Sequence, residues 1–163
     1  MAKTTAGLKF VKTDHGAPPV IAYFPVTIST AYKEGGVARI SATTGSAQKQ
    51  VATGTAILGV IADTVALANV SNSTRLGVYV DPNAIFEVKM LASSTPQQKV
   101  GDLVDLAVST TYNYRLSGST ASTKVFKIVG FNPNEALTAH TGVRYWVKIA
   151  KPIWGAGVTE AKG

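Results

Sequence analysis

The chain has no cysteine among its 163 residues, and this absence excludes several functions at once. Without a thiolate there is no cysteine nucleophile, no cysteine-bound zinc and no iron–sulfur cluster. The redox compartment stays open, because cytosolic and secreted chains can both lack cysteine. The missing residue therefore restricts the chemistry of the protein and not its location.

Long apolar runs are missing as well. A membrane-spanning helix needs about 20 mostly apolar residues, and the longest apolar stretch, residues 56–70, is interrupted by Gly59, Asp63, Thr64 and Asn69. The first residues, Met-Ala-Lys-Thr-Thr, lack the apolar segment of a secretory signal. We therefore expect a protein that is made in the cytoplasm and has no membrane partner.

Groups that commonly carry catalysis are few. Asp14 and His15 form the only adjacent acid–imidazole pair, and no Gly-x-Ser-x-Gly motif accompanies it; the second histidine is His140. Asp102 and Asp105 are three residues apart, so on a strand they would lie on opposite faces. Phosphate-binding, dinucleotide-binding and calcium-binding motifs are absent. We expect no enzyme, no cofactor and no metal site. A carboxylate pair assembled only by folding is the alternative.

The net charge of +7 is concentrated toward the two ends of the sequence. Residues 1–50 and residues 122–163 each carry six basic and two acidic groups, whereas residues 51–121 carry four basic and five acidic groups. Such a distribution favours association with an acidic partner. Nucleic-acid-binding tails typically contain five or more clustered basic residues, and this chain has no such stretch. We therefore do not expect nucleic acid as the partner.

Strand signals fill most of the chain. In residues 84–91 Phe86, Val88 and Met90 alternate with Glu87 and Lys89, the period of a half-buried antiparallel strand. Residues 143–151 repeat this pattern, with Tyr145, Val147 and Ile149 opposed to Trp146 and Lys148. Turn signals separate about eight to ten such segments. This spacing predicts an all-β protein, a compact β-sandwich or barrel-like domain over residues 20–152, followed by a C-terminal tail at residues 153–163.

The secondary structure of two segments is less clear from the pattern. Residues 56–61 are predicted as a strand because of Gly59 and the β-branched residues, whereas residues 64–69 could be strand or helix. Residues 20–30 are strongly β-forming, but Pro25 cannot donate a ladder hydrogen bond. We therefore expect an edge strand or a bulge there.

Residues 1–19 are predicted to form an extended N-terminal arm. Glycines and prolines bracket a short segment in which apolar residues alternate with lysines, a pattern that suits an edge strand or pairing with another molecule. The alternative is that the segment closes the protein's own sheet. The predicted contacts with a partner or a neighbouring copy are Leu8, Lys9, Phe10, Val11, Lys12 and, from the tail, Trp154.

Three segments resemble the head-decoration, or capsid cement, proteins of tailed bacteriophages. The first is Thr-Gly-Thr-Ala-Ile-Leu-Gly-Val-Ile-Ala at residues 53–62, and the second is Val-Gly-Asp-Leu-Val-Asp-Leu at residues 100–106. The third is Phe-Lys-Ile-Val-Gly-Phe-Asn-Pro-Asn-Glu at residues 126–135, followed by Tyr-Trp-Val-Lys-Ile at residues 145–149. Together they cover roughly residues 53–151; none is specific alone, since Gly-Asp and Asn-Pro turns occur in many β proteins.

This resemblance implies a β-tulip-like domain with an extended arm. It implies a structural virion protein on the capsid exterior, whose partner is the major capsid protein and which bridges neighbouring capsid subunits to stabilise the shell. A homo-oligomer is expected, with a trimer favoured and a dimer as the second choice. Proteins of this family are typically shorter, so residues 1–50 match least.

Other classes of function remain open at this stage. One is another β-rich virion component, such as a tail-tube or tail-fibre subunit. A second is a carbohydrate-binding β module that stacks sugars on Tyr145 or Trp146. A third is an enzyme whose carboxylates come together only in the fold.

Overall fold

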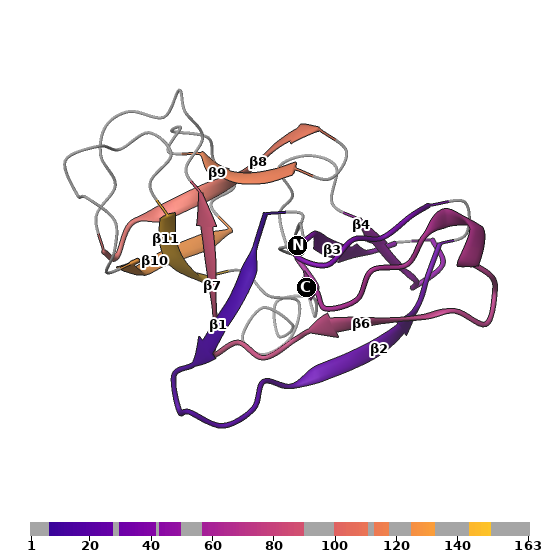
Figure 1. Cartoon of the computed structure of the whole chain (residues 1–163), viewed down its shortest axis with the longest axis horizontal. Helices are drawn as coiled ribbons and strands as arrows, with labels where there is room; N and C mark the ends of the chain where they lie inside the picture. Colours follow the sequence, from indigo (N-terminus) through magenta and orange to yellow (C-terminus); the bar gives the residue numbers. More distant parts are fainter. Residues whose placement is uncertain are drawn as a thin grey trace, which may run out of the picture.

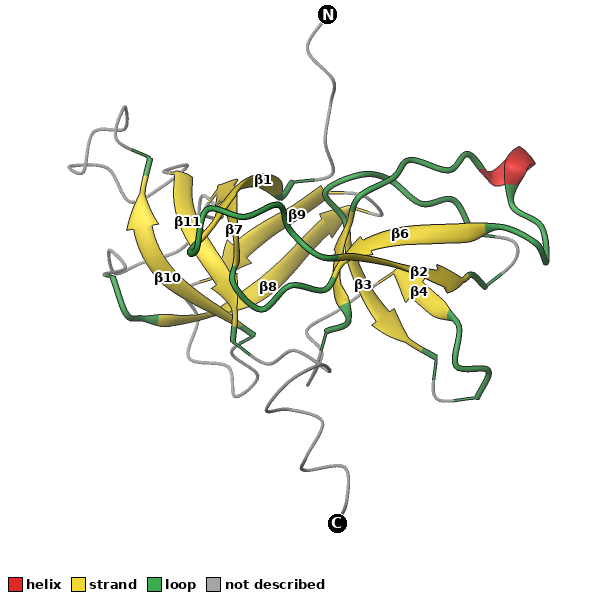
Figure 2. Ribbon diagram, turned by 90° about the horizontal axis from the view of Figure 1, so that it is seen from below, coloured by secondary structure: helices red, strands yellow, loops and turns green. Residues whose placement is uncertain are grey.

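The computed structural model describes residues 7–27, 30–41, 43–49, 57–89, 100–110, 113–117, 125–132 and 144–150. Within these ranges the protein consists of two antiparallel β-sheets that pack together, with no α-helix (Figures 1 and 2). The predicted all-β sandwich is confirmed. No helix of the described part is long and apolar enough to cross a membrane.

The larger sheet has six strands in a strongly non-sequential order. In spatial order they are β1 (Lys9–Thr13), β7 (Ala84–Lys89), β11 (Arg144–Ile149), β10 (Phe126–Phe131), β8 (Leu103–Thr110) and β9 (Asn113–Ser117). The sheet curls, because β9 contacts β7 in addition to its partner β8. β10 and β11 pair antiparallel, with Phe126 opposite Ile149 and Phe131 opposite Tyr145.

The smaller sheet has five strands, two of which are very short. In spatial order they are β2 (Ile21–Pro25), β6 (Arg75–Tyr79), β5 (Gly59–Ile61), β3 (Val37–Ile40) and β4 (Ala47–Lys49). β2 is an edge strand, as Pro25 predicts. The segment left open between strand and helix contains a bridge from Val65 to Tyr32 and a single 3-10 turn at Leu67–Asn69.

The five-stranded sheet is buried on both faces around β3 and β5. Val37 and Val60 pack into the core of the six-stranded sheet, whereas their chain neighbours Ala38 and Ile61 pack on the opposite side around Tyr32. A strand with two buried faces needs apolar residues at every position. This requirement explains why residues 57–61 include no polar or charged side chain.

The segment predicted as an arm differs in the structure. Residues 9–13 form β1 and pair with β7, with Lys9 opposite Glu87 and Phe10 opposite Phe86. Leu8 is only 1% exposed, and its N–H donates to the carbonyl of Gly35. Because Leu8 and Phe10 bury their side chains, the segment closes the protein's own sheet, which is the alternative to an arm. Residues 1–6 and the tail at 153–163, including Trp154, lie outside the described residues.

Candidate docking face

One face of the six-stranded sheet packs on the core, and the other carries most of its charge. On the outward face Lys9, Glu87 and Trp146 stand in register across β1, β7 and β11. Lys89 is opposite Arg144 at one end of the row, and Lys127 is opposite Lys148 at the other. We call this surface the basic face; its members are Lys9, Lys12, Glu87, Lys89, Lys127, Arg144, Trp146 and Lys148.

Two β-bulges determine what this face presents. Lys9 and Lys12 are three residues apart and would point to opposite sides of a regular strand. A bulge between Phe10 and Lys12 shifts the register, so that Lys12 is opposite Ile85 and points to the same side as Lys9. A second bulge in β10 places Gly130 opposite Trp146. The bulges therefore gather the lysines of β1 and set the backbone of Gly130 beside the indole ring.

Glu87 organises the centre of the basic face. Its side chain is 14% exposed, and its Oε2 accepts hydrogen bonds from Asn132 Nδ2 at 2.7 Å and from Trp146 Nε1 at 3.2 Å. Its other oxygen, Oε1, lies 3.6 Å from the guanidinium of Arg144. A single carboxylate thus contacts groups on β11 and at the end of β10, and it fixes the orientation of the indole ring.

Trp146 has neighbours around its ring as well as a partner at its N–H. Lys12 Nζ lies 5.4 Å from the ring centroid, a cation–π distance. A β-carbon placed on Gly130 would lie 3.4 Å from Trp146 Cε3, so the ring lies close to the bare backbone of β10. The indole is therefore a half-buried, fixed platform in the middle of the basic face.

Cations outnumber carboxylates on and beside this face. Lys148 forms an ion pair with Asp14, and Arg144 pairs with Glu87. In the part of the chain that the structure describes, the exposed side chains of Lys9, Lys89 and Lys127 form no ion pair, although Lys9 stands opposite Glu87. Six cationic groups thus stand against two carboxylates, and three of the six are free to meet an external anion.

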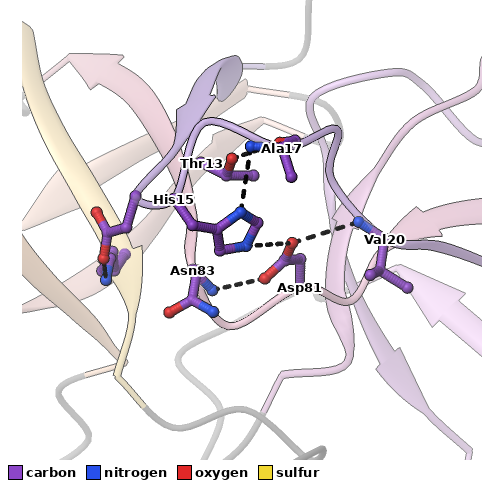
Figure 3. Close-up of polar contacts among 8 residues, drawn as sticks. Thr13, His15, Ala17, Val20, Asp81 and Asn83 are labelled. Carbon is purple, nitrogen blue, oxygen red and sulfur yellow. Dashed lines mark hydrogen bonds and ion pairs between the residues drawn. The ribbon is translucent and has the colours of Figure 1, made fainter.

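The Asp14–His15 pair does not form a dyad. Asp14 bonds to Lys148, whereas His15 turns toward Asp81, whose Oδ2 lies 3.7 Å from His15 Nε2 (Figure 3). His15 Nδ1 accepts the N–H of Ala17 at 3.2 Å, so both ring nitrogens are engaged. The nearby hydroxyl of Thr13 donates to the carbonyl of Ala17 and not to the imidazole. This arrangement fixes a turn and offers no activated nucleophile.

Asp81 joins the two connections that run between the sheets. It is buried, and it accepts hydrogen bonds from the N–H groups of Val20 at 3.4 Å and Asn83 at 2.8 Å (Figure 3). Val20 lies on the connection from β1 to β2, and Asn83 lies on the connection from β6 to β7. The carboxylate therefore holds together two crossovers between the six-stranded and five-stranded sheets.

Five of the six residues predicted to meet a partner are described by the structure, and they divide into two groups. Lys9 and Lys12 lie exposed on the basic face, and Val11 sits half-buried at the bulge. Leu8 belongs to the core, and Phe10 points inward against Tyr79 and Phe86, so neither is available to a partner in this conformation. The sixth residue, Trp154, lies outside the described residues.

The sequence named Trp146 only as a residue for sugar stacking, and it did not single out Glu87 or the basic face. The alternation around Glu87 and Trp146 was a usable signal for outward positions, but it did not show that β7 and β11 are neighbours. Tyr145, one of the two residues considered for sugar stacking, is 1% exposed and belongs to the core. Among the described residues no group of three or more His, Asp or Glu side chains is placed to hold a metal ion.

Comparison with models of known protein families gives no match, and no curated protein matches the chain.

Proposed function

We propose that the protein is a structural virion protein that binds the outside of an icosahedral phage capsid and bridges neighbouring major capsid protein subunits. The observation that carries this proposal is the basic face: a fixed sheet surface with three free lysines around an oriented indole. Such a surface suits binding to an extended acidic surface. The polar pair that could suggest catalysis is engaged in holding a turn.

The resemblance to cement proteins supports the proposal from a second side. Its closing segment lies on β10 and β11, which supply Lys127, Arg144, Trp146 and Lys148 to the basic face. The residues that carry the resemblance and the residues that carry the charge are thus partly the same. No catalytic step or cofactor is part of the proposed function.

Stabilisation of the shell would follow from mass action. A protein that binds only the assembled shell stabilises it by RT ln(1 + [L]/Kd), about 2.7 kcal/mol per site when its concentration is a hundred times Kd. A homo-oligomer, with a trimer favoured, would engage several capsid subunits at once and add a multivalent gain.

The test uses shells assembled from the major capsid protein that is encoded in the same genome. Purified protein is mixed with these shells, and the bound copies per shell and the temperature of shell disassembly are measured. We expect saturable binding at a fixed number of copies and a higher disassembly temperature. Absence of binding would overturn the proposal. Isolated protein that polymerises into tubes would assign it to the tail.

The variants for this test must keep β1 in place. Deletion of residues 1–17 would remove the edge strand β1 and the buried side chain of Leu8, so it would report on folding and not on binding. Substitution of exposed lysines on β1 leaves the inward residues Leu8 and Phe10 intact and is the appropriate change.

A further inference from the structure

We propose that the basic face is the surface through which this chain docks, that Trp146 is its central anchor, and that its occupant is an acidic surface of a folded protein. For the identity of that protein the inference rests on the proposed function, under which the occupant is the outer surface of the shell. The inference goes further by naming the surface and the chemistry of its partner.

The layout of the face is that of a docking surface. Trp146 lies at its centre, and Arg144 lies at the end where Lys89 is opposite it. The free lysines Lys9, Lys89 and Lys127 lie around Trp146 on three different strands. Tryptophan and arginine are enriched among the residues that dominate binding energy, and they are typically surrounded by a polar rim. Neighbouring strands are about 4.8 Å apart, so the four strands β1, β7, β11 and β10 span about 14 Å. This width is enough for the centre of an interface of standard size.

The centre of the face is ordered before any partner arrives. The indole N–H is held by Glu87, the ring has Lys12 over it, and Gly130 leaves room for it on β10. Binding energy is lost when side chains must be immobilised on association, at roughly 0.5–1.5 kcal/mol for each rotamer-rich side chain. A ring already fixed in place avoids most of that loss. In this respect Trp146 differs from an exposed aromatic side chain that no neighbour holds in place.

The charges favour a protein over a nucleic acid. Sequence-tolerant nucleic-acid binding uses a basic groove and aromatic rings whose faces are open for base stacking. Here Lys12 already lies over the ring of Trp146, and the carboxylate of Glu87 sits at the centre of the face. A polyanion laid across this centre would meet that carboxylate. A protein surface can place its own acids opposite the three rim lysines and avoid Glu87.

The experiment compares two charge-reversal variants of the whole chain. The face variant carries Lys9→Glu, Lys89→Glu and Lys127→Glu. The matched control reverses three cations that lie outside the basic face: Lys33→Glu, Arg39→Glu and Arg75→Glu. Each is tested for binding to the shells, to immobilised poly-L-glutamate and to an oligo-dT of about 20 nucleotides. Folding is checked by circular dichroism and thermal unfolding.

We expect the face variant to bind shells at least about tenfold more weakly and the control to bind within about twofold of the wild type. Wild-type binding should weaken as the salt concentration rises, because exposed charges are screened. If the wild type binds shells and the face variant binds equally well, or if the control loses as much, the docking surface is wrong while the proposed function stands. Tighter binding of oligo-dT than of shells through this face would overturn the assignment to an acidic protein.

Binding to poly-L-glutamate separates the two proposals. If the wild type does not bind shells but is retained by poly-L-glutamate, and the face variant is not, the proposed function fails and the docking surface stands. A face variant that binds shells and poly-L-glutamate as tightly as the wild type does would overturn the docking surface. Trp146→Ala tests the anchor: we expect about thirtyfold weaker shell binding, with Tyr23→Ala, an exposed aromatic outside the basic face, as the control. Equal losses in the two variants would contradict the role of Trp146.

Discussion

The aromatic rings of Phe10 and Tyr79 stack with their centroids 5.2 Å apart and their planes inclined by 13°. Phe10 lies on β1 of the six-stranded sheet and Tyr79 on β6 of the five-stranded sheet, so this contact joins the two sheets. Phe86 meets both rings edge-on, at centroid distances of 6.1 and 5.8 Å. The N-terminal strand is at the edge of its sheet, and its Phe10 side chain forms part of the contact between the two sheets.

Phe10→Ala is expected to lower the free energy of unfolding by about 3 kcal/mol, the lower end for a Phe→Ala change because Phe10 is only partly buried. The substitution removes the stack on Tyr79 and the contact with Phe86. Urea unfolding followed by circular dichroism measures the change. Leu67→Ala is the control, since Leu67 is 55% exposed and should change stability by less than about 0.5 kcal/mol. An unchanged stability of the Phe10 variant would mean that β1 is not docked.

Gly59→Ala is expected to prevent normal folding. A β-carbon at this position would lie 2.0 Å from the backbone oxygen of Tyr79 and 2.8 Å from Val78 Cγ1, and a backbone atom in a sheet cannot move aside cheaply. We expect a loss above about 3 kcal/mol, seen as insoluble protein or a much lower unfolding midpoint.

The control for this change is Gly45→Ala. Nothing lies within 4 Å of a β-carbon at Gly45, and its φ of +67° costs an alanine only about 1 kcal/mol. If both variants are destabilised equally, close packing is not the reason that position 59 needs glycine.

The strands were predictable where one face is buried and the other is not. The alternation of Phe86 and Val88 with Glu87 predicts which side chains enter the core. In the structure Phe86 and Val88 are buried there and Glu87 is on the other face. β5 was harder, because a strand buried on both faces shows no alternation and resembles a buried helix.

The candidate site was harder to predict from the sequence than the strands were, and the reason is physical. The basic face depends on β1, β7 and β11 being neighbours, although they are widely separated along the chain. It also depends on a one-residue bulge that turns Lys12 to the side of Lys9. Periodicity carries neither the order of strands nor the position of bulges. The prediction of Lys9 and Lys12 therefore identified part of the face, whereas Leu8 belongs to the core.

Asp81→Ala is expected to lower the free energy of unfolding by about 2 to 3 kcal/mol. The change leaves the N–H groups of Val20 and Asn83 without the carboxylate that accepts from them, and bonds to a charged acceptor are worth more than neutral ones. Amide hydrogen exchange should show faster exchange at both residues.

His15→Ala is the matched control for the Asp81 change. The His15 side chain is 47% exposed, so loss of its contact with Asp81 should cost less than about 1 kcal/mol. A larger effect at His15 than at Asp81 would contradict the view that the buried carboxylate holds the two crossovers together.

Because of Tyr32, the stability of the folded protein is expected to depend on pH in the alkaline range. Its ring is buried, and its hydroxyl donates to the carbonyls of Thr27 and Ala47, each at 3.1 Å. Burial raises the pKa of Tyr32 above its ordinary value of 10.0. The folded protein therefore keeps this proton at a pH where the unfolded chain releases it. The stability contributed by Tyr32 is fully present below pH 10 and is lost as the pH rises through the raised pKa.

Tyr32→Phe is the variant that tests this dependence. Near neutral pH it should lower the free energy of unfolding by about 1 to 2 kcal/mol, because two buried carbonyls lose a donor. The gap between wild type and variant should then narrow as the pH rises above 10, since only the wild type carries the ionisable phenol at this site. Urea unfolding at a series of pH values from about 8 to 11 measures the gap. A gap that stays constant over this range would contradict a folded state that requires the neutral phenol.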